Sequence, residues 1–204
     1  MTVLQITPGS KTPGEIMSDK YLVDCCSGTL AAIKCASLFS CTPECDADLN
    51  DWIAEKNAEL NTRGIHLYVL KRCESCALVY VFRISQLRRT LEDPKNRDFL
   101  LRYGYPVGTG DLYLCLSHLK ERMRGCSSST FPHEIGVFLG YPLCDVTGFI
   151  DNRGKNYTVS GLWKSYAGKE EAGRTFSRLN KCRHVYWQLW VSGRRSILQL
   201  TVAG

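Results

Sequence analysis

The chain has 204 residues, which is typical of a single domain with one core. Hydrophobic residues make up 44% of the sequence and charged residues 23%, and this composition excludes a disordered, fibrous or low-complexity protein. The net charge of +6 is moderate and its basic residues are dispersed, so we expect an acidic protein partner and no nucleic acid.

The longest stretches without Asp, Glu, Lys or Arg, such as 135–144, have ten residues, whereas a helix that crosses a bilayer needs roughly 20. The first residues lack the basic start and apolar centre of a secretory signal. We therefore expect a cytoplasmic protein that does not associate with a membrane. The eleven cysteines cannot all pair within the chain, so we expect mostly reduced thiols, as suits an anaerobic cytoplasm.

The first predicted element is an irregular segment. Residues 1–20 are polar, contain two prolines and two glycines, and show no periodicity, which predicts a flexible arm before a single domain over 21–204. Residues 29–39 carry one charge, on Lys34, and their apolar residues predict a helix that runs through the core. Residues 47–62 repeat apolar side chains at helical spacing and predict an amphipathic surface helix.

The middle of the chain contains a predicted hairpin followed by helices. Residues 65–70 and 77–83 are rich in β-branched and aromatic side chains and are separated by a short polar segment, which predicts two paired strands. Helical spacing follows at 87–91, 97–103 and 111–123.

The last third returns to β-branched and aromatic residues around one helix at 170–182. A cluster of tryptophans and tyrosines that includes Trp163 and Trp187 is expected in a sheet core. The fold class predicted is α+β, with N-terminal helices packed on a largely antiparallel sheet formed mainly by the C-terminal third. The strands predicted for that sheet are 135–139, 146–150, 159–166, 185–191 and 196–202.

A nucleophile candidate stands at the expected start of the first helix. Cys26 would lie at or just before the first turn, where unpaired N–H groups and the helix dipole stabilise a thiolate. Cys25 is an equally available thiol, and only its greater distance from the helix makes it the second choice.

A base and an acid candidate follow in the segment FPHEIGVFLGYPLCDVTGFI. His133 and Asp145 are twelve residues apart around a Gly-Tyr-Pro turn, so a hairpin would place them at the same end, where a carboxylate can orient an imidazole. Cys26, His133 and Asp145 are thus predicted to be nucleophile, base and orienting acid. Glu134 would point to the opposite face of the strand, which favours a structural salt bridge.

Two thiol pairs, Cys41 with Cys45 and Cys73 with Cys76, allow several interpretations. Four thiolates suit a tetrahedral zinc site, but the spacing matches no familiar zinc module. A local disulfide or redox role and free surface thiols stay open. No glycine-rich phosphate loop follows a strand, so we expect no nucleotide, and no cofactor of any kind is predicted.

The segment FPHEIGVFLGYPLCDVTGFI, together with CSGTLAAIKCASLF, LLRYGYP and GLWKSY, resembles the bacterial "domain of unknown function 3793" family, found mainly in anaerobes. The resemblance covers about residues 21–202. Members typically have Cys-Ala-Pro-Thr-Leu where this chain has Cys-Ser-Gly-Thr-Leu, which aligns the family cysteine with Cys26 and places Gly28 where they have proline. The family is similar to papain-like cysteine enzymes, some of which are acyltransferases or amide synthetases of natural-product pathways.

The resemblance and the predicted triad lead to one expected activity. In a papain-like acyltransferase or amide synthetase, the Cys26 thiolate attacks a thioester or amide carbonyl, His133 moves the proton and Asp145 holds the imidazole. The acyl group then passes to an amine acceptor or to water, and its expected donor is an acidic carrier protein. The alternative is a non-enzymatic cysteine-rich protein that handles metal or redox state through the two thiol pairs.

Overall fold

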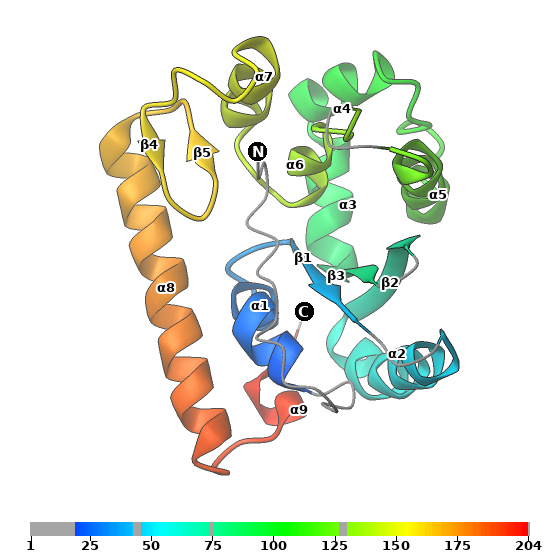
Figure 1. Ribbon diagram of the computed structural model, residues 1–204, viewed down its shortest axis with the longest axis vertical. Helices are drawn as coiled ribbons and strands as arrows, with labels where there is room; N and C mark the ends of the chain where they lie inside the picture. Colours follow the sequence, from blue (N-terminus) through cyan, green and yellow to red (C-terminus); the bar gives the residue numbers. More distant parts are fainter. Residues whose placement is uncertain (1–18, 43–45, 74–75, 127–129, 204) are drawn as a thin grey trace. The chain divides into compact units, whose positions relative to one another are not determined.

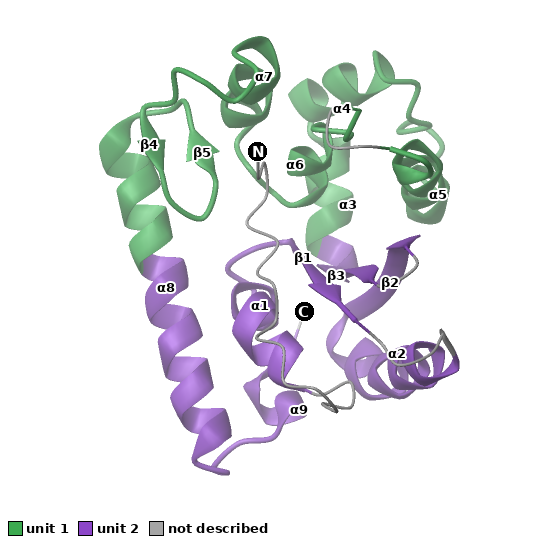
Figure 2. Cartoon of the chain, in the orientation of Figure 1, with its two compact units in different colours: residues 1–5, 86–177 green, residues 6–85, 178–204 purple. Residues whose placement is uncertain are grey.

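The computed structural model describes residues 19–42, 46–73, 76–126 and 130–203, and it confirms an α+β protein with an antiparallel sheet (Figure 1). The described chain divides into two compact units (Figure 2). Residues 86–177 belong to unit 1, and the described residues before and after them belong to unit 2. The single domain over 21–204 stays a prediction. Most of the predicted arm, residues 1–18, lies outside the described residues.

Unit 2 is built on a three-stranded antiparallel sheet of order β1-β3-β2. The predicted strand pair is confirmed as β2 and β3, and the predicted helix at 47–62 is confirmed as α2. The central strand β3 is buried along its whole length, and both of its edges are paired. The elements of this unit are α1 (Lys20–Leu30), β1 (Ala36–Cys41), α2 (Asp46–Leu60), the 3-10 turn η1 (Asn61–Arg63), β2 (Ile65–Arg72), β3 (Ala77–Arg83), the later part of α8 (Lys169–Val191) and α9 (Ile197–Leu200).

The predicted helix at 29–39 is wrong. α1 ends at Leu30, Ala32 turns the chain with a φ of 57°, and β1 begins at Ala36. Almost every residue of β1 is buried, so the strand has no polar face and no alternation to reveal it. A short run that is apolar on all sides fits a buried strand as well as a buried helix.

The later half of α8 packs on α1 within unit 2. A Cβ at Gly28 would stand 2.7 Å from Leu179 Cδ2, so the two helices approach closely at a residue without a side chain. The Cys182 thiol donates to the carbonyl of Ser27 at 3.5 Å. The glycine at position 28 therefore lies inside a helix and serves packing.

Unit 1 is mainly helical, and the three helices predicted between residues 87 and 123 are confirmed. Asp93 and Asp111 cap two of them, since each carboxylate accepts hydrogen bonds from two backbone N–H groups of the first turn. The elements are α3 (Ile84–Glu92), most of which lies in this unit, α4 (Pro94–Leu101), α5 (Leu112–Met123), α6 (Ile135–Phe138), α7 (Leu143–Asp151), β4 (Val159–Ser160), β5 (Lys164–Ser165) and the start of α8.

The sheet predicted for the C-terminal third is wrong. Helices α6, α7 and α9 occupy three of its predicted strands, and α8 continues through a fourth to Val191. Of the segment 159–166, only β4 and β5 are strand, two residues each. Here β-branched and aromatic residues serve helix packing: Tyr186 and Trp190 stand four residues apart on α8 and pack against the core of unit 2. No helix among the described residues is both long and apolar enough to cross a membrane.

Candidate ligand-binding site

Cys26 does not lie at a helix start, which corrects that prediction. It is the seventh of the eleven residues of α1, and its side chain is fully buried. Burial raises the pKa of the Cys26 thiol well above its usual value, Cys25 raises it further, and Lys34 opposes the shift. The thiol is therefore protonated at neutral pH, and the first-turn N–H groups are not beside it.

The three residues of the predicted triad belong to different units. Cys26 lies in unit 2, whereas His133 and Asp145 lie in unit 1. The convergence of all three therefore stays a prediction. The predicted hairpin between His133 and Asp145 is wrong, because this segment forms α6, a turn and α7.

His133 and Asp145 nevertheless line one pocket of unit 1, which we call the His133 pocket. Its empty space, counted together with the open solvent at its mouth, is about 360 Å³. Residues of α6 and α7 and of the segment at β5 form its wall, so it unites the FPHEIGVFLGYPLCDVTGFI and GLWKSY segments. The side chains that give it its character are those of His133, Tyr141, Asp145, Phe149, Trp163 and Lys164.

A glycine makes this meeting of α6 and α7 possible. A Cβ at Gly136 would lie 2.7 Å from Val146 Cγ2 and 3.3 Å from Tyr141 Cδ2. Because real Cβ atoms do not approach so closely, a larger residue would push the two helices apart and open the floor of the pocket.

Asp145 is buried and fully engaged by one segment of the chain. Its Oδ2 accepts a hydrogen bond from Trp163 Nε1 at 2.7 Å. Its Oδ1 accepts from Ser165 Oγ at 3.0 Å and from the backbone N–H groups of Tyr166 and Ala167 at 2.7 and 3.0 Å. These four donors fix the 163–167 segment on α7 and hold the indole of Trp163 in the pocket wall.

Aromatic rings form much of that wall. Tyr141 and Trp163 stack with ring centroids 4.5 Å apart and planes 20° apart. The ring of Phe149 meets the imidazole of His133 edge-on, with centroids 5.0 Å apart. The sequence prediction placed Trp163 in a sheet core and did not name Tyr141 or Phe149 as site residues. The signal that could have identified all three is their position inside the two segments that carry the family resemblance.

Lys164 brings a positive charge to the pocket. Its Nζ donates to the carbonyl of Gly154 at 2.8 Å and lies 4.9 Å from the ring centroid of Tyr157 and 5.9 Å from that of Phe149. An ammonium has three hydrogens, and the Gly154 carbonyl uses one.

His133 is the polar group of the pocket that the described residues leave unsatisfied. Its Nδ1 is buried and has no hydrogen-bond partner among them. Burial lowers the pKa of His133, and the neighbouring Glu134 opposes this shift. The imidazole is therefore neutral at pH 7, with one nitrogen that donates and one that accepts. A buried polar atom without a partner costs about 1–3 kcal/mol.

Glu134 has the structural role predicted for it. It is buried and accepts from Tyr105 Oη at 3.1 Å and from Arg122 Nε. The guanidinium of Arg122 also lies over the ring of Tyr103, 5.4 Å from its centroid. Burial and the Glu134 charge raise the pKa of Tyr105, so this phenol stays a donor to the carboxylate.

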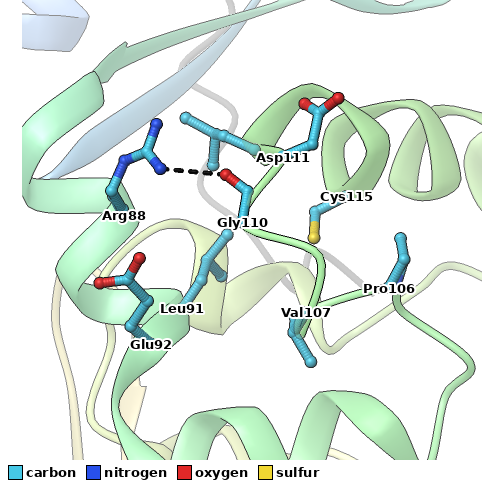
Figure 3. Close-up of a pocket in the computed structure, with 9 residues that line it drawn as sticks. Arg88, Leu91, Glu92, Pro106, Val107, Gly110, Asp111 and Cys115 are labelled. Carbon is cyan, nitrogen blue, oxygen red and sulfur yellow. Dashed lines mark hydrogen bonds between the residues drawn. The ribbon is translucent and has the colours of Figure 1, made fainter.

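Unit 1 has a second pocket, between α3 and α5, which we call the Cys115 pocket (Figure 3). Its empty space, open solvent at the mouth included, is about 280 Å³, and Leu91 and Cys115 lie in its wall. Arg88 donates from Nη1 to the carbonyl of Gly110 at 3.0 Å across its mouth. Burial and the nearby Asp111 raise the pKa of Cys115 to about 11, so its thiol is protonated at neutral pH.

Three of the four cysteines in the two thiol pairs lie at one end of the unit 2 sheet. Cys41 ends β1 opposite Ala77, and the backbone N–H of Cys73 donates to the carbonyl of Cys76 at 2.7 Å. Cys45 lies outside the described residues, so the four-thiolate site stays a prediction. Within the described part of the chain, no three His, Cys, Asp or Glu side chains are grouped to hold a metal ion.

The comparison with known families agrees with the resemblance seen in the sequence. Residues 22–201 match the family described as "Protein of unknown function (DUF3793)". The chain belongs to this family. No curated protein and no solved structure matches the chain.

Proposed function

We propose that the chain binds a small organic anion with a flat, unsaturated body in the His133 pocket. The observation that carries this proposal is the unpartnered Nδ1 of His133, on a ring that lines an aromatic pocket beside the ammonium of Lys164.

The aromatic walls favour a flat ligand. The stacked pair of Tyr141 and Trp163 and the ring of Phe149 offer π faces and edges to the pocket. A planar ring against such faces gains about 0.5–1.5 kcal/mol per aromatic contact beyond the burial of its area. A branched aliphatic molecule of the same volume would not gain this contribution.

The charges favour an anion. The Asp145 carboxylate is already satisfied by four donors, whereas Lys164 gives one hydrogen bond to a carbonyl and keeps its positive charge. A carboxylate on the ligand would pair with this ammonium, and the neutral imidazole of His133 would donate to it or accept from it. Because burial lowers the pKa of His133, the imidazole meets the ligand as a neutral hydrogen-bonding group.

The test uses benzoate as the anionic probe and benzyl alcohol as its neutral match, each titrated into the full chain by calorimetry at pH 7.5. We expect saturable benzoate binding that Lys164→Met weakens about tenfold, equal to about 1.4 kcal/mol, with little change for benzyl alcohol. His133→Leu should weaken both probes. Lys181→Met is the matched control, because Lys181 is an exposed lysine of α8 in unit 2. No saturable binding, or an equal loss in both lysine variants, would contradict the proposal.

The papain-like cysteine acyltransferase stays a second proposal, because His133 and Asp145 line one pocket. It would take an acyl thioester, with an acidic carrier protein as donor and an amine as acceptor. It requires Cys26 to alkylate faster at pH 7 than an ordinary exposed thiol such as Cys73. Brief iodoacetamide treatment and peptide mapping measure the two rates, and a Cys26 rate at or below that of Cys73 contradicts the mechanism.

A further inference from the structure

The end of the β2–β3 hairpin brings two accessible thiols opposite each other. Arg72 and Ala77 are partners in the antiparallel ladder, so Cys73 and Cys76 are the next facing pair. The Cys73 N–H donates to the Cys76 carbonyl at 2.7 Å, which confirms that the two residues face each other. Cys73 is exposed and Cys76 is half-buried.

This arrangement suits a disulfide. Facing residues of an antiparallel pair point to the same side of the sheet, with Cα atoms about 4.5–5.5 Å apart. Disulfides span Cα separations of about 4.4–6.8 Å, so the separation expected of a facing pair lies within their range. The ladder already holds the two thiols together, and the loss of chain entropy on closure is therefore small.

From this geometry we infer that Cys73 and Cys76 form a reversible dithiol–disulfide site that exchanges with small disulfides. The Cys73 thiolate attacks one sulfur of the small disulfide, forms a mixed disulfide and releases the first small thiol. Cys76 gives up its proton and attacks the Cys73 sulfur, which releases the second small thiol. Two protein thiols are oxidised to one disulfide and one small disulfide is reduced to two thiols.

Exposure makes the bond reversible and gives the two residues different roles. A disulfide at an exposed hairpin end stays open to attack by thiols, as labile and regulatory disulfides are. Cys73 is the more exposed thiol and so meets the small disulfide first. Cys41, which ends β1 nearby, is buried and donates its S–H to the carbonyl of Ala77 at 3.7 Å, so it is the slower competitor. The site lies in unit 2 and does not depend on the His133 pocket.

The experiment equilibrates the reduced full chain in glutathione buffers of rising disulfide fraction, with acid quenching, alkylation and peptide mapping. We expect a 73–76 disulfide, about 2 Da lighter than the dithiol, to appear before any other thiol is lost, and to disappear when the buffer is made reducing. Cys76→Ser should trap glutathione on Cys73, and Cys73→Ser should slow glutathione capture at residue 76. Cys126→Ser is the matched control, since Cys126 is a half-buried thiol of unit 1.

Two results would overturn the inference. In one, Cys73 and Cys76 stay alkylatable at disulfide fractions that already oxidise Cys126, or the first disulfide joins Cys73 to another cysteine. In the other, both thiols resist glutathione and alkylation until a chelator is added, which would mean that a bound metal holds them.

Discussion

Each unit contains one buried charged side chain that neutral groups satisfy, and the two differ in what they hold together. Asp145 in unit 1 is 3% exposed and takes its four donors from the single segment 163–167. Arg83 in unit 2 is 1% exposed and donates to the carbonyls of Thr29, Leu30 and Val202 at 2.6–2.7 Å. Asp145 therefore shapes one local pocket, whereas Arg83 joins the end of α1 to a segment more than a hundred residues away.

The largest effect is expected at Asp145. Asp145→Ala removes four hydrogen bonds and leaves buried donors without acceptors, so the free energy of unfolding should fall by about 3–5 kcal/mol. Denaturant unfolding followed by near-UV signals of Trp163 measures it. Asp145→Asn keeps one acceptor oxygen, so its free energy of unfolding should fall less. An equal fall in both variants would mean that the size of the side chain, and not its acceptance of hydrogen bonds, stabilises this site.

A smaller loss is expected at Arg83. Arg83→Met keeps the length and apolar stem of the side chain but removes three hydrogen bonds, which should cost about 2–4 kcal/mol. The Val202 carbonyl loses its donor, whereas the carbonyls of Thr29 and Leu30 each keep a backbone N–H donor. The free energy of unfolding measures it, with Arg83→Lys as the partner variant because it restores one donor group. If Arg83→Met is as stable as the wild type, the guanidinium does not hold unit 2 together.

The buried carboxylate of Glu134 tests whether a buried charge stays stable after it loses one of its hydrogen-bond donors. Tyr105→Phe removes one of the bonds to Glu134 and leaves that of Arg122, so a loss of about 1 kcal/mol is expected. Thermal unfolding at pH 7 measures this. A loss as large as that of Asp145→Ala would show that Glu134 depends on the phenol more than on the guanidinium.

The smallest effect concerns the pH dependence of stability in unit 1. Burial lowers the pKa of His133 below the value of 6.5 that it has in the unfolded chain. As pH falls below 6.5, the unfolded state binds a proton before the folded state does, so stability is lost between 6.5 and the folded pKa. His133→Phe should flatten this part of the stability profile. A steeper loss in the variant than in the wild type would give the opposite sign and contradict the shift.

The sequence predicted best those elements that have one buried and one exposed face. The stripe of α5 that contains Leu112, Leu116 and Leu119 is buried as expected, and the apolar side of the predicted surface helix α2 is buried likewise. It failed where a segment is apolar all round, as in β1, and where glycines let short helices pack closely, as at Gly136. How closely two helices pack depends on the partner helix, and the periodicity of one segment gives no information about that partner.

The candidate site divides in the same way. His133 and Asp145 line one pocket, but Asp145 accepts its hydrogen bonds from residues 163–167 and the hairpin assumed for the pair is absent. The orientation of the imidazole by Asp145 stays a prediction. The engagement of Asp145 by residues 163–167 was not predicted, because those donors include backbone N–H groups that every sequence offers. The positions of Lys164 and of the stacked rings depend on these hydrogen bonds of Asp145, so the sequence did not predict them either.

Helix α8 has a consequence for the order in which the chain folds during synthesis. Its residues 169–177 belong to unit 1 and its residues 178–191 to unit 2 (Figure 2). A ribosome therefore releases all of unit 1 before unit 2 has its last helices, although unit 2 was begun first. Until Val202 emerges, the Arg83 guanidinium has to keep water in place of that carbonyl. The core of unit 2, which includes Ile197 and Leu200, is thus incomplete until α9 is released.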